Sequence, residues 1–210
     1  MNRNFIIVGD SITYGIGDYN ELGWATMLKK YVVSKDSTLT CSSFVHIAGF
    51  PGATSSDILY KLESILNAFN DSSFDTTVII AIGINDTQFL DLNESLNIEN
   101  YKTNMNAIID IINDRGYDLA VVGLTRIFAN ANEVNDNKYY DSRNINAFYE
   151  DLNLIKNYDD VLEKVCIERN VKYIPLKDLL DENDVTDCLH PTSLGHEKIF
   201  NILKSNLDLD

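Results

Sequence analysis

Residues that make tight turns are scarce in this chain, which has 10 glycines and three prolines among 210 residues. Their combined share is about half of that in an average soluble protein. Because an all-β sandwich or barrel needs turns between its many short strands, this composition argues against an all-β fold.

Cysteine is also scarce, and the chain has an odd number of them, Cys41, Cys166 and Cys188. No pair has the C-x-x-C spacing that zinc and redox sites use. The sequence therefore predicts neither a disulfide framework nor a metal site. We expect the protein in the cytoplasm, where thiols stay reduced.

Basic residues are outnumbered, with 17 Lys and Arg against 32 Asp and Glu and a net charge of −15. A surface of this charge repels nucleic-acid phosphates and anionic lipids, so we expect no nucleic-acid partner. Long apolar runs are missing too: residues 5–8 are too few for a signal peptide, and residues 78–82 are too few for a membrane span. We expect no stable membrane association, and the sequence leaves the oligomeric state open.

One pattern recurs along the chain. Five short apolar runs rich in Val and Ile are each followed by a loop and then by an amphipathic stretch. Such runs are typical of strands buried on both faces, and the stretches have helical spacing. We predict strands at residues 5–8, 44–48, 78–82, 119–124 and 171–174, and helices at residues 22–33, 55–69, 98–112, 145–167 and 193–203. This alternation predicts an α/β fold with helices on both faces of a parallel sheet.

The pattern indicates one domain over residues 1–210, with a loop insertion around residues 126–143. The insertion is polar, rich in Asn and long for a connection between a strand and a helix. It is either a solvated surface segment or a loop that borders or covers the substrate site, because long loops often carry function.

Polar residues gather where the predicted strands end, and ligands of open parallel sheets bind beyond the carboxyl ends of the strands. Ser11 follows the first strand, where the chain turns toward a helix and presents the hydroxyl outward. A serine hydroxyl is a weak nucleophile at neutral pH, so it needs a base beside it.

His190 is the best candidate for that base. His46 falls inside the second predicted strand and His196 inside the last predicted helix, where we expect structural roles. His190 stands at a junction between loop and helix, and Asp187 precedes it by three residues. In a turn, Asp187 can accept a hydrogen bond from one ring nitrogen and leave the other to take the serine proton.

Three further groups suit an oxyanion, namely the N–H groups of Ser11 and Gly52 and the side-chain amide of Asn85. Taken singly, Gly52 could be a turn glycine and Asn85 a cap. Asp10 and Asp86 are predicted to brace loops by accepting backbone N–H bonds. The phosphate-binding and dinucleotide-binding glycine motifs are absent, so nothing in the sequence indicates a nucleotide cofactor.

The chain resembles the SGNH hydrolases, also called the GDSL esterase/lipase family, in four sequence blocks. The blocks read VGDSITYG at residues 8–15, GFPGAT at residues 49–54, GIND at residues 83–86 and DCLHP at residues 187–191. They occur in family order and span nearly the whole chain, which makes the resemblance specific. Two positions depart from the pattern: Ile47 stands where many relatives have Asn, and Cys188 where many have Gly.

The resemblance implies a flavodoxin-like three-layer α/β/α sandwich with a five-stranded parallel sheet. It implies Ser11 as nucleophile, His190 as base, Asp187 as the partner of that base, and Ser11, Gly52 and Asn85 as oxyanion donors, with no cofactor or metal. We expect a serine esterase or lipase that cleaves small neutral carboxylic esters with short-chain acyl or acetyl groups through an acyl-enzyme. Two alternatives stay open, a non-catalytic ligand-binding domain that retains the blocks and an acyltransferase that uses the same site.

Overall fold

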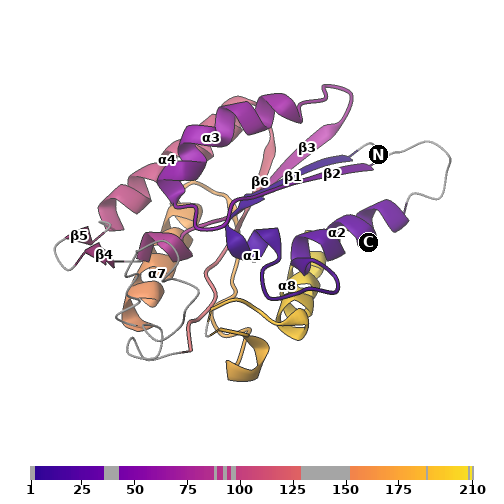
Figure 1. Cartoon of the computed structure of the whole chain (residues 1–210). Helices are drawn as coiled ribbons and strands as arrows, with labels where there is room; N and C mark the ends of the chain where they lie inside the picture. Colours follow the sequence, from indigo (N-terminus) through magenta and orange to yellow (C-terminus); the bar gives the residue numbers. More distant parts are fainter. Residues whose placement is uncertain are drawn as a thin grey trace.

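The structure is a computed structural model that describes residues 3–35, 43–87, 89–91, 94–95, 98–128, 152–187, 189–207 and 209. Within these residues, five parallel strands form a sheet in the order β2-β1-β3-β6-β7 (Figure 1). The strands are β1 (Arg3–Gly9), β2 (Ser43–Gly49), β3 (Asp75–Ala81), β6 (Asp118–Val122) and β7 (Lys172–Ile174). This is the flavodoxin-like strand order, and it confirms the predicted fold class.

Helices cover both faces of the sheet and complete the three layers. On one face α2 packs against α8 and the short α1, and on the other α4 packs between α3 and α7 (Figure 1). The helices are α1 (Ser11–Tyr14), α2 (Gly23–Ser34), α3 (Ser55–Ala68), α4 (Ile98–Asp114), α7 (Leu152–Glu168) and α8 (Ser193–Asn206). Each of the five long helices matches a predicted one; residues 145–151 of the predicted fourth helix lie outside the described residues.

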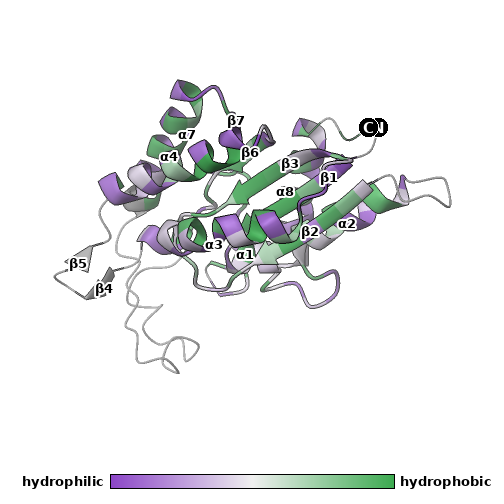
Figure 2. Ribbon diagram, turned by 90° about the horizontal axis from the view of Figure 1, so that it is seen from above, coloured by the Kyte–Doolittle hydropathy of each residue, from purple (hydrophilic) through white to green (hydrophobic). Residues whose placement is uncertain are grey.

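The core lies between the layers, where strands buried on both faces meet the apolar stripes of the helices. Residues 5–8 of β1 are at most 2% exposed, and Ile79 and Ile80 of β3 are fully buried. Figure 2 shows the same arrangement, with hydrophobic strands in the middle and hydrophilic outer surfaces on the helices. The predicted stripe on α4 is buried throughout, at Tyr101, Met105, Ile108, Ile109 and Ile112. None of the helices in the described part of the chain is both long and apolar enough to cross a bilayer.

The register of the sheet puts several loops on one rim. Gly9 at the end of β1 pairs with Gly49 of β2 and with Ala81 of β3, so these three strands end at the same level. The chain leaves this rim into α1, into the turn before α3 and into the 3-10 helix η1 (Ile84–Thr87). The first three sequence blocks are therefore assembled at one end of the sheet.

Several small elements were not predicted, η1 among them. An antiparallel pair, β4 (Phe89–Asp91) and β5 (Glu94–Ser95), precedes α4, and a 3-10 helix, η2 (Glu182–Asp184), precedes the last block. Residues 126–128 of the predicted insertion are described; its remainder lies outside the described residues.

Candidate active site

Ser11 is the first residue of α1, at a sharp turn out of β1. The side chain of Asp10 caps the helix by accepting the N–H of Ile12 at 2.9 Å. A Cβ atom at Gly9 would lie 2.2 Å from Thr13 Oγ1 and 2.3 Å from the carbonyl oxygen of Ala81, so only glycine fits. The strand can therefore turn at once into the helix and place Ser11 on the rim.

A chain of hydrogen bonds joins Ser11 to the last sequence block. The Oγ atom of Ser11 lies 2.9 Å from Nε2 of His190. The Nδ1 atom of His190 lies 2.6 Å from Oδ2 of Asp187. An ionised carboxylate accepts, so Nδ1 carries the hydrogen and Nε2 faces the serine with its lone pair.

The carboxylate of Asp187 is held on both sides. Its Oδ1 atom accepts the N–H of His190 at 2.7 Å and that of Leu189 at 3.3 Å. Burial by itself raises the pKa of Asp187, but the hydrogen bonds and charge of His190 and the N–H of Leu189 together lower it below its usual value. The carboxylate is therefore ionised at neutral pH, as an orienting partner for the imidazole requires.

The turn that carries these two residues is closed by main-chain bonds. The N–H of Thr186 donates to the carbonyl of His190 at 2.8 Å, and the N–H of Thr192 donates to that of Asp184 at 2.7 Å. Thr192 then caps α8 through its hydroxyl, which accepts the N–H of Gly195 at 3.2 Å. His190 is thus fixed just ahead of a helix, at 9% exposure. Cys188 lies outside the described residues.

The loops with Gly52 and Asn85 are tied to each other. Gly52 has a φ of 78°, in the left-handed region that favours glycine. The side-chain nitrogen of Asn85 donates to the carbonyl of the next residue, Ala53, at 2.9 Å, and Asn85 is 5% exposed. The structure thus holds Gly52 and Asn85 side by side on the rim that also carries Ser11.

Asp86 braces the same pair of loops, as predicted from its position. Its carboxylate accepts the N–H of Ser55 at 2.8 Å and the hydroxyl of Ser55 at 2.5 Å. Burial raises the pKa of Asp86 to about 6, against the lowering effect of the bonds from Ser55. Burial likewise raises the pKa of Asp10 to about 6. In the fold, the charged forms of both carboxyl groups therefore lose hydration that they would have in water.

Comparison with known proteins places the chain. Residues 7–198 match the GDSL-like lipase/acylhydrolase family. The chain belongs to this family. Membership makes it a hydrolase that acts on ester bonds. A search of curated protein sequences gives no match.

Solved structures of GDSL-like hydrolases and related esterases share the fold of this one. The lipase/acylhydrolase from Enterococcus faecalis is 21% identical over 98% of this chain and 95% of that one, with a TM-score of 0.70. The acetyl xylan esterase AlAXEase is 17% identical over 96% and 98%, with a TM-score of 0.69. A catalytic mutant of Axe2, an acetylxylan esterase from Geobacillus stearothermophilus, is 16% identical over 99% and 94%, with a TM-score of 0.71.

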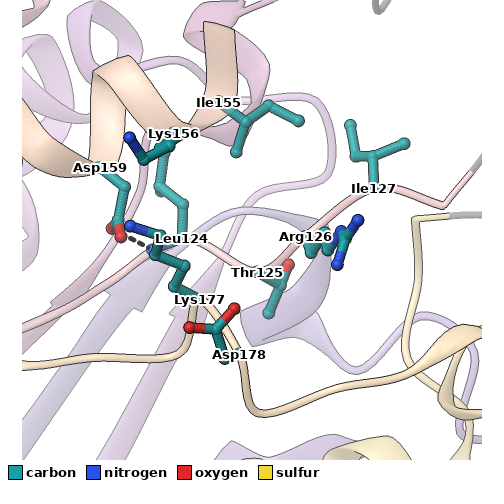
Figure 3. Close-up of a pocket in the computed structure, with 9 residues that line it drawn as sticks. All are labelled: Leu124, Thr125, Arg126, Ile127, Ile155, Lys156, Asp159, Lys177 and Asp178. Atoms are coloured by element: carbon teal, nitrogen blue, oxygen red, sulfur yellow. Dashed lines mark hydrogen bonds between the residues drawn. The ribbon is translucent and has the colours of Figure 1, made fainter. Parts of the chain in front are cut away.

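A pocket of about 200 Å³ lies beyond the ends of β6 and β7 in this GDSL-like hydrolase (Figure 3). Its lining mixes apolar side chains with charged ones of both signs: Leu124, Thr125, Arg126, Ile127, Ile155, Lys156, Asp159, Lys177 and Asp178. Helix α7, which forms one wall, also contacts the η1 segment that carries Asn85. The hydroxyl of Thr125 is buried and has no hydrogen-bond partner within the described residues. The pocket is therefore a largely apolar hollow with charged groups at its wall, beyond the carboxyl ends of the parallel strands.

The other two histidines have the positions that the sequence predicted. His46 lies in β2 and stacks on Phe69, with ring centroids 4.3 Å apart. His196 is fully buried in α8. The contacts of His196 left no signal in the sequence, because its partners are main-chain groups far along the chain. Among the described residues, no three His, Cys, Asp or Glu side chains are arranged to hold a metal ion.

Proposed function

We propose that the protein is a serine esterase in which Ser11 is the nucleophile, His190 the general base and Asp187 the group that orients the base. The observation that carries the proposal is the unbroken hydrogen-bonded chain from Ser11 Oγ through the imidazole to the carboxylate. Three Axe2 structures support it, because they are catalytic mutants that replace a serine, an aspartate or a histidine with alanine. The aspartate and histidine replaced there are three residues apart, as they are here.

The reaction follows from this geometry. Nε2 of His190 takes the proton of Ser11 as Oγ bonds to the ester carbonyl carbon. The resulting oxyanion accepts hydrogen bonds from the N–H groups of Ser11 and Gly52 and from the amide of Asn85. The imidazolium then protonates the leaving alcohol as the C–O bond breaks. Water repeats the sequence on the acyl-enzyme, releasing the acid and restoring Ser11.

For the substrate, we propose a small neutral ester with a short acyl or acetyl group. The net charge of −15 opposes the approach of anionic substrates and anionic bilayers. The pocket in Figure 3 offers donors, acceptors and an apolar wall together, which suits a neutral alcohol rich in hydroxyl groups better than an anion. Two structural neighbours are esterases of acetylated xylan. We place this reaction in the cytoplasm, without a cofactor, a nucleic-acid partner or stable membrane association.

A substrate panel tests the proposal. We expect kcat/KM to fall from p-nitrophenyl acetate to the palmitate ester, and an acetylated sugar to be hydrolysed. We also expect a neutral ester to exceed a matched anionic ester, by more at low salt than at high salt. A preference for the anionic ester that weakens with salt would contradict the substrate class. Hydrolysis outpaced by transfer to an added alcohol would favour the acyltransferase, and no turnover at all would favour the binding domain.

A further inference from the structure

His196 is fully buried on α8, and both ring nitrogens have fixed main-chain partners. Its Nδ1 accepts the N–H of Trp24 at 3.3 Å, and its Nε2 lies 3.0 Å from the carbonyl oxygen of Ile16. An N–H group can only donate and a carbonyl can only accept. The ring is therefore neutral, with its hydrogen on Nε2.

The contact between His196 and Trp24 caps the N-terminus of helix α2. The residue before this helix, Leu22, has a φ of 61° and provides no side-chain cap. The first N–H groups of the helix are accepted instead by Asp18, whose Oδ2 takes the N–H of Gly23 at 3.2 Å, and by the ring of His196. Because the first N–H groups of a helix have no partners within it, α2 depends on these two side chains for its N-terminus.

Residues 15–22, which we call the clamp loop, connect this arrangement to the proposed nucleophile. The N–H groups of Gly15 and Ile16 both donate to the carbonyl of Ser11, at 3.1 and 3.0 Å. The carbonyl of Ile16 in turn accepts from His196. The main chain of Ser11 is therefore two hydrogen bonds away from the buried imidazole.

The clamp loop also contacts the segment that carries His190. Gly17, at a φ of 97°, lies so close to the next segment that a Cβ there would be 2.1 Å from the carbonyl oxygen of Pro191. The hydroxyl of Ser193 donates to Asp18 at 2.6 Å. Both contacts fall within three residues of His190. Residues 15–18 of the clamp loop thus contact both the Ser11 segment and the His190 segment.

We propose that His196 is a positioning residue, which in its neutral form holds Ser11 and His190 at reacting distance through the clamp loop. This rests on the proposed function and goes beyond it, since His196 touches neither substrate nor reacting atoms. A displacement of about 1 Å between reacting groups can reduce a rate about 100-fold, so the stability of the clamp loop bears directly on kcat.

Protonation of His196 would break the arrangement. A proton on Nδ1 would oppose the N–H of Trp24, and the positive end of helix α2 would repel the imidazolium. Two titratable groups act on the pKa of His196 from nearby: the carboxylate of Asp18 raises it, and a positive charge on His190 would lower it. Burial, the largest effect, lowers the pKa of His196. Acid would therefore weaken the clamp loop by protonating His196.

Three substitutions separate positioning from packing. His196→Phe keeps the volume and loses both hydrogen bonds, His196→Asn keeps an acceptor near Nδ1, and His196→Gln keeps a donor near Nε2. Leu203→Ala is the matched control, since it empties a fully buried site on the same helix and leaves the clamp loop intact. All four are assayed well below their melting temperatures, with the folded fraction measured.

We expect His196→Phe to lower kcat at least about tenfold with little change in KM, and the Asn and Gln variants to recover part of it. Leu203→Ala should keep the wild-type kcat. The amide of Trp24 should exchange its hydrogen faster in His196→Phe alone, and the acid limb of the pH profile should be less steep in His196→Gln than in the wild type. A wild-type kcat for His196→Phe, or an equal loss in Leu203→Ala, would overturn the proposal. Neither outcome touches the proposed function, which is tested separately and would fail if hydrolysis survived Ser11→Ala.

Discussion

Replacing Asn85 with alanine should have two effects that can be measured separately. The first is on stability, because the carbonyl of Ala53 loses the hydrogen bond that it accepts from Asn85 at 2.9 Å. An unpaired buried group of this kind costs about 1–3 kcal/mol. In a chain of this length each kcal/mol lowers the melting temperature by about 2–4 °C.

The second effect is on the reaction. If the amide of Asn85 also donates to the oxyanion, its loss should lower kcat about 10²–10³-fold, which corresponds to about 2.7–4 kcal/mol of transition-state stabilisation. KM should change little, because the oxyanion exists only after attack. Steady-state hydrolysis of a p-nitrophenyl ester, corrected for the folded fraction, gives both constants.

Thr54→Ala is the matched control for this substitution. It removes the hydroxyl that caps α3, next to the same loop, and should cost about 0.5–2 kcal/mol of stability with the amide of Asn85 still in place. The reasoning is refuted if Asn85→Ala keeps a kcat within about threefold of wild type. It is equally refuted if Thr54→Ala loses as much activity, or if the loss in Asn85→Ala falls on KM alone.

Three other substitutions test neighbouring parts of the account. Asp187→Asn should lower kcat by up to about 10⁴-fold, because an amide no longer fixes the tautomer of His190; a loss below about tenfold would contradict this role. Gly17→Ala should lower the melting temperature by at least about 4 °C, because its Cβ would meet the carbonyl of Pro191 at a positive φ, and an unchanged melting temperature would speak against the close contact. Because the pKa of Asp86 is raised to about 6 in the fold, this residue favours folding below about pH 4, and that contribution, at most about 3 kcal/mol, disappears as the pH rises to 6. The melting temperature of the wild type relative to that of Asp86→Asn should therefore fall as the pH rises from 4 to 6, and a difference that does not change with pH would contradict the shift.

Local patterns were enough to predict the sheet and the long helices. Runs such as residues 5–8 and 78–82 are buried on both faces, so their composition alone marks them as strands. Asp10 and Asp86 were predicted as braces because a carboxylate beside free N–H groups has an obvious local use. The antiparallel pair β4 and β5 left no comparable pattern, since strands of two or three residues are too short to show a period.

Contacts between residues far apart in the chain could not be predicted from the sequence. Ser11 and His190 could be nominated because each belongs to a recognisable block, but their separation of 2.9 Å depends on the whole sheet. His196 meets Trp24 and Ile16, which are more than 170 residues away and contribute only main-chain atoms. A partner that uses its main chain imposes no residue type, so no sequence signal records the contact.

Covalent labelling of Ser11 tests the central claim most directly. The intact protein is treated with a fluorophosphonate, which reacts with activated serines, and the modified peptide is identified by mass spectrometry. The account predicts one added group on Ser11, no label on Ser11→Ala, and slower labelling of the Asp187→Asn variant because the base is less well oriented. A label on another residue, or undiminished labelling of Ser11→Ala, would contradict it.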